Sequence, residues 1–232
     1  MLPSILFDEF KRRLHPPLPQ LTVDSYGVAK LHPNDRPNAS SLELALEYII
    51  SDGLPDASIS PAFGKFLALQ CRTGQVKNVL LVGLHGGYAT TWIATMNPQV
   101  HITALEADSS HAQVARENIN KVGVSSQVEI IEGQALGTLP NVEAEFAFID
   151  ADLEHSWDYT NKAICISRPG ANIIVNKVVQ CGKVADTEPE TVDIDGAQKV
   201  IERTGMGPRV EACLMQQVSE KGYDGYLMAV VK

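Results

Sequence analysis

The sequence predicts an α/β fold with a mostly parallel sheet covered by helices on both faces. From Asn78 onward, short apolar runs typical of buried strands alternate with segments of helical character. Gly83, Gly86 and Gly87 form a turn directly after the first of these strands, and Glu106 stands at the carboxyl end of the second. Strand, glycine turn, helix, strand and acidic residue in this order predict the first half of a doubly wound domain.

The glycine turn predicts a nucleoside site. Ligands of such folds bind beyond the carboxyl ends of the strands, and an acidic residue about 20 positions after the glycines binds ribose hydroxyls. Glu106 has that position. Leu84 and His85 separate the first two glycines, so the spacing is not the dinucleotide GxGxxG pattern. The alternative is a βαβ unit with an ordinary turn.

The remaining elements follow from apolar periodicity, caps and turn residues. Strands are expected at 79–82, 101–105, 128–132, 145–150, 172–176, 209–217 and 226–231. Helices are expected at 3–14, 42–50 with Ser40 or Ser41 as cap, 61–70, 90–96, 109–122 with Ser109 or Ser110 as cap, 157–167 and 195–204. The proline-rich segment 15–38 is expected to be mostly extended or turned, and 221–225 to form a hairpin turn.

Composition narrows the class of protein. The chain has 232 residues, of which 44% are apolar, and a net charge of −9 with scattered Lys and Arg, which argues against nucleic acid or an anionic membrane as partner. It has no bilayer-length apolar run and no secretory signal pattern. Its four cysteines lack CxxC or Cys/His spacing, so zinc and disulfide frameworks are not expected. We expect one cytoplasmic domain at 1–232, with a helical cap at 1–77 and a Rossmann-like core at 78–232.

Seven ordered motifs carry a resemblance to a known family. They are ISPAFGKFLAL, GGYAT, ALEAD, GQALGTLP, FIDAD, ISRPG and KGYDGY, and they span roughly 60–232. In these motifs the chain resembles the small cation-dependent O-methyltransferases, the group that includes catechol and caffeoyl-CoA O-methyltransferases. The resemblance implies S-adenosylmethionine as cofactor and the class I methyltransferase fold, a seven-stranded sheet with a reversed last strand. It also implies a homodimer.

The resemblance assigns roles to single positions. Gly83 and Tyr88 would line the methionine end of the cofactor with Ile59 nearby, and Gln134 and Ala135 would lie against the adenine. The alternatives are that Tyr88 packs the helix and that Gln134 is a turn residue. The full predicted cofactor set is Ile59, Gly83, His85, Tyr88, Glu106, Ala107, Gln134, Ala135 and Asp150.

The predicted metal site departs from the family. The family binds a divalent cation through an aspartate ending the fourth strand and an Asp-Asn pair ending the fifth. Here Asp150 is kept, but the pair reads Asn176-Lys177. An ammonium is a donor only and repels a cation, so we expect weak or absent magnesium binding and assign no metal ligand. Leu153 stands where the family has its base lysine, and Leu81 where it has a glutamate that contacts the cofactor.

We hypothesise that the Lys177 ammonium occupies the vacated metal position, paired with Asp150, and stabilises a phenolate or enolate oxygen. His155 and Asp152 are the nearest candidates for a general base, with His155 preferred. The alternatives are a solvated Lys177 or a surface ion pair, and loop histidines without a role at His155 and His85.

The predicted function is S-adenosylmethionine-dependent O-methylation of a small hydroxylated, aromatic acceptor, with weak or no cation dependence. The alternative is a repurposed, non-methylating protein that keeps the fold and binds the cofactor, or that uses Lys177 to polarise a carbonyl. An NAD-dependent oxidoreductase is disfavoured by the glycine spacing. The acceptor would be set by the cap and by the loop 179–195, and neither carries a recognisable signature.

Overall fold

The protein is described by a computed structural model that covers residues 19–32, 36, 38–51, 54, 58–138 and 143–232. In these ranges, seven strands form one sheet of order β3-β2-β1-β4-β5-β7-β6. β1 to β5 pair in parallel, and β7 runs antiparallel to both β5 and β6. The predicted fold class, with its reversed last strand, is confirmed. The helix predicted at 3–14 lies outside the described residues.

The strands occur where apolar runs predicted them. Their bounds are Asn78–Val82 (β1), His101–Glu106 (β2), Val128–Glu132 (β3), Ala144–Ile149 (β4), Ser167–Asn176 (β5), Val210–Ser219 (β6) and Gly222–Val231 (β7). Leu81 and Phe148 face one hydrophobic cluster, whereas Leu80 and Val82 face another. This alternation follows from the two-residue period of a strand, and it gives the sheet a buried core on each face.

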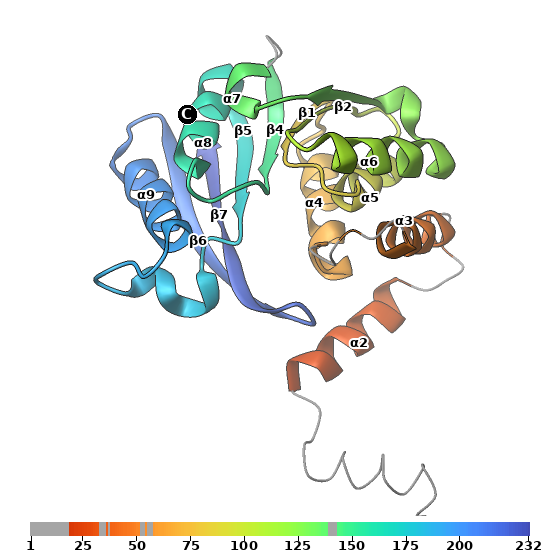
Figure 1. The fold of residues 1–232 in the computed structure, drawn as a ribbon, viewed down its shortest axis with the longest axis horizontal. Helices are drawn as coiled ribbons and strands as arrows, with labels where there is room; N and C mark the ends of the chain where they lie inside the picture. Colours follow the sequence, from red (N-terminus) through yellow and green to blue (C-terminus); the bar gives the residue numbers. More distant parts are fainter. Residues whose placement is uncertain (1–18, 33–35, 37, 52–53, 55–57, 139–142) are drawn as a thin grey trace, which may run out of the picture.

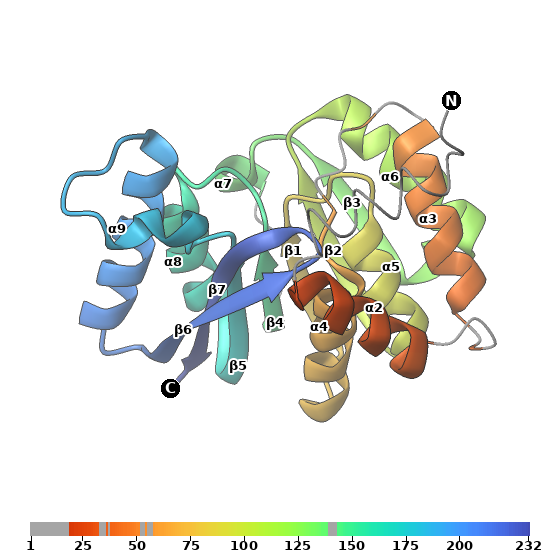
Figure 2. The ribbon, with the colours of Figure 1, turned by 90° about the horizontal axis from the view of Figure 1, so that it is seen from below.

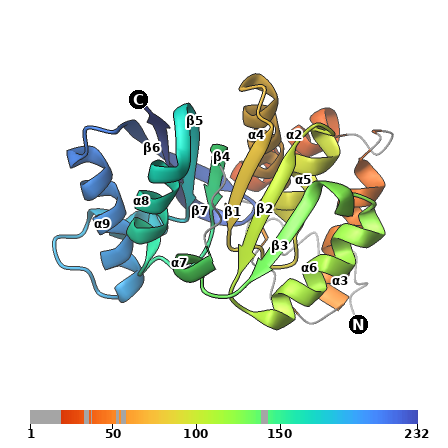
Figure 3. The same cartoon turned by 90° about the horizontal axis from the view of Figure 1, so that it is seen from above.

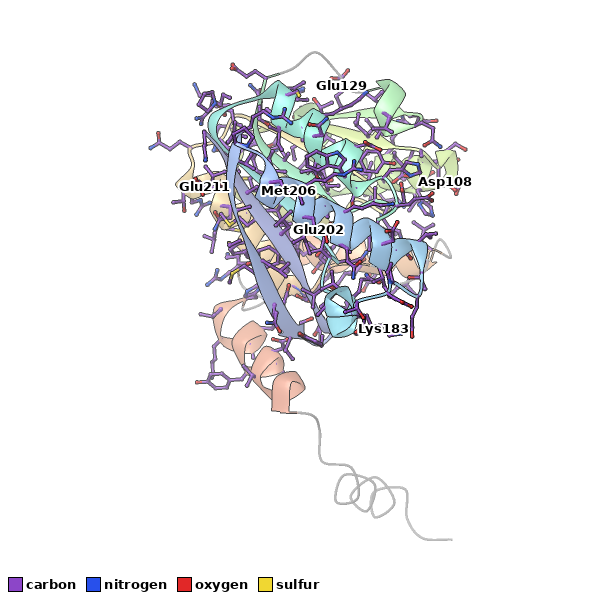
Figure 4. The ribbon with its side chains drawn as sticks, turned by 90° about the vertical axis from the view of Figure 1, so that its left-hand side faces the viewer. Asp108, Glu129, Lys183, Glu202, Met206 and Glu211 are labelled. Atoms are coloured by element: carbon purple, nitrogen blue, oxygen red, sulfur yellow. The ribbon has the colours of Figure 1, made fainter. Side chains whose placement is uncertain are left out.

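Helices cover both faces of the sheet (Figure 1, Figure 3). On one side lie Ala39–Ser51 (α3), Pro61–Thr73 (α4), Tyr88–Met96 (α5) and Ser109–Val122 (α6). On the other lie Ala135–Thr138 (α7), Ser156–Ile166 (α8) and Val192–Met206 (α9). Short 3-10 turns occur at Ser125–Gln127 (η1) and Gln180–Ala185 (η2). Figure 4 views the α9 side and labels Glu202 and Met206 on α9 and Glu211 on β6.

The segment before the first strand contributes directly to the core. α4 begins at the predicted place, where the Ser60 hydroxyl accepts a hydrogen bond from Phe63 N at 3.3 Å. The Phe63 ring lies 6.0 Å from that of Phe148 and 5.0 Å from that of Tyr226, centroid to centroid. α4 therefore packs on the sheet rather than standing apart from it.

The extended conformation predicted for 15–38 is wrong in its centre, because Pro19–Leu31 forms a helix (α2). The prolines of this segment lie at or outside the ends of that helix, and Pro19 is its first residue, where a missing N–H costs no intrahelical hydrogen bond. Two caps also differ from expectation. α3 begins at Ala39, before both predicted cap serines, and Asp108 rather than a serine caps α6.

The terminal hairpin turns earlier than predicted. Ser219 pairs with Gly222, so the turn is Glu220-Lys221 and most of 221–225 belongs to β7. The hairpin extends toward α2 (Figure 2), where Glu220 N donates to Asp24 Oδ2 at 2.6 Å. Among the described helices, none is both long and apolar enough to cross a membrane.

Candidate active site

A cavity of about 360 Å³ opens at the carboxyl ends of β1, β2, β4 and β5. Of the predicted residues it brings together Gly83, His85, Glu106, Ala107, Gln134, Ala135, Asp150, Asp152 and Lys177. It is also lined by His111 and Tyr159, which the sequence interpretation missed. The size lies within the range of about 300–1,000 Å³ usual for small-molecule sites.

The Glu106 carboxylate holds the glycine turn in place by accepting hydrogen bonds from its backbone. Its side chain is buried, and its Oε2 accepts hydrogen bonds from Leu84 N and His85 N, both at 2.9 Å. Its Oε1 accepts from Asp108 N at 3.0 Å. A carboxylate offers about four lone-pair directions, so capacity remains for a hydroxyl in the cavity. The geometry is compatible with the predicted ribose role.

Gly83 is needed where the strand ends meet. Its φ is +86°, a conformation that disfavours side chains. A Cβ at this position would lie 2.3 Å from the carbonyl oxygen of Asp150. The absence of a side chain therefore lets the carboxyl ends of β1 and β4 approach each other at the cavity floor.

Lys177 and Asp150 form the ion pair that the sequence hypothesis expects. Lys177 Nζ lies 3.0 Å from Asp150 Oδ1, with side chains 45% and 16% exposed. Lys177 has a left-handed backbone with φ +60°, and strained residues of this kind cluster at functional sites. Gln180 Nε2 donates to the Lys177 carbonyl at 2.7 Å. Asp224 Oδ1 accepts from Val179 N at 3.0 Å, so the loop that carries the lysine is tied to β7.

The residues at this position do not fit a divalent cation. Asp150 supplies one carboxylate, and Asn176, which ends β5 and is buried, supplies one amide beside the Lys177 ammonium. No cluster of three or more His, Cys, Asp or Glu suited to a metal occurs in the described part of the chain. Leu81 and Leu153 lie in the hydrophobic clusters on opposite faces of the sheet. These two positions therefore provide no polar group in place of the family's glutamate and lysine.

Two smaller hollows adjoin the main cavity. One of about 30 Å³ is lined by the predicted pair Ile59 and Tyr88, together with Gly83 and Asp150. The other, of about 130 Å³, is lined by Ser58, Ile59, Phe63, Asn176, Lys177 and hairpin residues. Lys177 lines both this hollow and the main cavity. Lys177 is therefore a wall that the two spaces share.

The geometry does not support His155 as general base. Its side chain is half exposed, lines none of these three spaces, and has its Nδ1 2.6 Å from Asp152 Oδ1. The hydrogen bond to Asp152 raises the pKa of His155, which favours the protonated form. Asp152 is itself engaged, because Tyr159 Oη donates to its Oδ2 at 2.6 Å. Burial, followed by this hydrogen bond to Asp152, raises the pKa of Tyr159.

His85 lies in the cavity wall in a left-handed conformation, with φ +50°. Burial lowers its pKa, and electrostatic interaction with His111 and Lys177 lowers it further. Its ring centroid is 5.2 Å from that of His111, and among the described residues its Nε2 has no hydrogen-bond partner. A neutral His85 therefore offers one ring nitrogen for hydrogen bonding.

The strand order and the cavity at the strand ends define a Rossmann-like methyltransferase fold. The model of the O-methyltransferase family matches residues 38–221. The chain therefore belongs to the O-methyltransferase family.

Relatives and solved structures agree with this assignment. The O-methyltransferase imqG of Aspergillus flavus is 41% identical over 222 residues, 90% of each chain. A catechol O-methyltransferase of Mycobacterium tuberculosis is 37% identical, covering 77% of this chain and 83% of its own length. The structure of the Bacillus cereus O-methyltransferase in complex with SAH superposes with a TM-score of 0.87 at 36% identity, over 92% of this chain and 98% of that one.

Proposed function

We propose that the protein is an S-adenosylmethionine-dependent O-methyltransferase for a small hydroxylated, aromatic acceptor, with little or no need for a divalent cation. The observation that carries this proposal is the Lys177–Asp150 ion pair in the main cavity, whose lysine also lines the adjoining hollow. Family membership and the SAH complex of a similar structure support the methyl donor.

The volume and the lining residues of the main cavity support cofactor binding there. Glu106 would accept a hydrogen bond from a ribose hydroxyl, and Gln134 and Ala135 would border the adenine. Ile59 and Tyr88 would border the methionine end from the small hollow. When bound, the cofactor supplies an electrophilic methyl group on a sulfonium.

Lys177 would act on the acceptor oxygen. An ammonium has three N–H donors, and its ion pair with Asp150 engages at most one or two of them. A remaining N–H directed at the acceptor hydroxyl would stabilise the phenolate that attacks the methyl group. Alignment of this oxygen with the methyl group would supply much of the rate, because in-line displacement is sensitive to orientation.

The second candidate function is a non-methylating protein that retains the cofactor site. The burial of Leu81 and Leu153 in the core favours it, since the polar groups that the family uses at these positions have no replacement there. Under this alternative the cofactor binds but no phenol is methylated.

We propose a single cytoplasmic domain that assembles as a homodimer and does not bind nucleic acid. The net charge of −9 supports the last point. The sheet ends in β6, an edge strand with exposed Leu214, Met215 and Val218, and such an edge suits pairing with a second copy. Light scattering at several protein concentrations tests the homodimer, and a monomer at all of them would refute it.

The first experiment is calorimetric titration of S-adenosylmethionine, followed by methyl transfer to phenols of graded acidity, in EDTA and in magnesium. We expect saturable binding, and equal transfer in both buffers. Glu106→Gln should weaken binding at least tenfold, whereas Glu129→Gln on β3, exposed and outside the cavity, should not. Absence of binding would refute the proposal, binding without transfer would favour the alternative, and transfer only with magnesium would refute cation independence.

A further inference from the structure

A separate cavity of about 150 Å³ lies among α2, α3, α4 and α5, which gather on one side of the sheet (Figure 2). Its walls are mainly apolar and include Val28, Leu42, Leu46 and Trp92. Of the residues assigned to the methyltransferase site, Tyr88 alone also borders this cavity. Tyr88, the first residue of α5, therefore lies between this cavity and the small hollow beside the methyltransferase site.

Positive charge gathers at the rim of this cavity. Arg36 and Lys65 line it, with Glu43 as the acidic residue among the described lining. His32 also lines it, but burial and the charges of Lys65 and Arg36 lower its pKa, so it adds little positive charge. Within the described ranges, neither Arg36 nor Lys65 forms an ion pair. Burial lowers the pKa of Lys65, and the charges of Arg36 and Arg72 lower it further. Such mutual repulsion would be relieved by a bound anion.

Trp92 lines the cavity beside these cations, with only a small part of the residue accessible. Its side chain is 3% exposed and packs on Gly64, where a Cβ would lie 2.3 Å from Trp92 Cδ1. The His32 ring meets it edge-on at 5.2 Å, and Lys65 Nζ lies 5.9 Å from the ring centroid. Trp92 Nε1 and His32 Nδ1 are buried and have no hydrogen-bond partner among the described residues. An acceptor atom reaching them would satisfy groups that are costly to bury unpaired.

We propose that this cavity binds a small aromatic carboxylate, with its ring among Val28, Leu42, Leu46 and Trp92 and its carboxylate between Arg36 and Lys65. The volume is sufficient, since a protein cavity of about 150 Å³ holds a benzene ring. Arginine and lysine both form strong charge-assisted hydrogen bonds to a carboxylate. This site is distinct from the methyl-transfer site, and it does not depend on the proposed activity.

Benzoate is the probe, and Trp92 is the reporter. The chain has two tryptophans, and the other, Trp157, lies against Arg203 on α9. In a Trp157→Phe background the emission therefore reports Trp92 alone. We expect a saturable change with benzoate, and at least tenfold weaker binding of neutral benzamide. Lys65→Gln and Arg36→Gln should each weaken benzoate at least tenfold, while Lys121→Gln on α6, outside this cavity, should not.

A variant that fills the cavity without changing its charge distinguishes binding inside the cavity from binding to a basic surface. Ala39→Leu enlarges a lining side chain and should abolish binding while the circular dichroism spectrum stays unchanged. A linear, non-saturating response to benzoate, or equal binding by wild type and Lys65→Gln, would overturn the proposal. Competition by S-adenosylhomocysteine would also overturn it, because benzoate would then occupy the methyltransferase cavity.

Discussion

Replacing Lys177 by methionine removes the ammonium and keeps a similar chain length. If the ammonium stabilises the acceptor oxygen, kcat should fall while the affinity for S-adenosylmethionine changes little. The attraction between two unit charges about 3 Å apart is ~5 kcal/mol at an effective dielectric constant of about 20. Because the Lys177 side chain is 45% exposed, solvent screening reduces this contribution. We expect a loss of about 1.4–2.7 kcal/mol, equivalent to about 10- to 100-fold in kcat.

The assay compares acceptors of graded acidity in EDTA. A phenol that is already ionised at the assay pH needs less help to lose its proton, so the loss should be largest for the least acidic phenol. Lys177→Arg keeps the charge and should retain more activity than Lys177→Met. An equal rate in wild type and Lys177→Met, or a loss independent of acceptor acidity, would show that Lys177 is only a surface ion pair.

A double variant tests the same reasoning from the opposite direction. Asn176→Asp combined with Lys177→Asn recreates the Asp-Asn pair of the resembled family beside Asp150. Two carboxylates and an amide are oxygen ligands that suit magnesium. We expect this variant to be inactive in EDTA and to gain activity with magnesium, whereas the wild type is indifferent. Failure of magnesium to activate a folded double variant would show that the lysine does not stand at a metal position.

Three further predictions concern stability and positioning. Gly83→Ala should lower the free energy of unfolding by roughly 2–4 kcal/mol in denaturant titrations, and by more than Gly123→Ala does. Both glycines have a positive φ, but a Cβ at Gly123 would meet nothing within 4 Å. Equal losses would refute the role of close approach. The pKa of His155 is raised on folding, so its ion pair stabilises below about pH 6.5 and weakens as pH rises through the folded pKa. His155→Ala should therefore lower Tm at pH 5.5, by an amount equivalent to less than about 1 kcal/mol given its exposure, and lower it less at pH 8.5; the reverse order would contradict the sign. Asp224→Asn weakens the acceptor of Val179 N and should lower kcat more than it raises KM for the cofactor, because it frees the loop that carries Lys177; an effect on cofactor KM alone would argue against this.

The sequence predicted the sheet well because buried parallel strands are short, apolar and bounded by turns. It failed at α2, where proline density suggested an extended segment although the prolines stand at or beyond the helix ends. It also placed the last turn too late, because glycines within β7 were interpreted as turn residues. Whether a proline or glycine ends a helix or strand depends on its position within the element, and not on how many such residues a segment contains.

The residues of the candidate site also fall into those that the sequence could predict and those that it could not. Glu106 and Gly83 followed from spacing, since both stand at strand ends whose relative position the fold class fixes. Tyr159 and His111 could not be found, because they reach the cavity from α8 and α6, and their entry depends on how these helices pack. His155 illustrates the converse error, since nearness to Asp150 in the sequence did not bring it into the cavity.

The replacement of the family's Asp-Asn pair by Asn176-Lys177 at the end of the fifth strand preserves the local net charge, although it replaces a metal ion by an ammonium. In the resembled family, a divalent cation between two aspartates leaves this position near neutral. Here Asp150 and Lys177 form a pair of opposite charge, so an acceptor phenolate would meet a similar overall balance. The difference lies in coordination, because a metal can chelate two vicinal oxygens, whereas an ammonium donates separate hydrogen bonds. A lysine site therefore does not require two vicinal hydroxyls, and monohydroxy phenols should be methylated nearly as well as catechols. A strong preference for the catechol over its monohydroxy analogue in EDTA would contradict this argument.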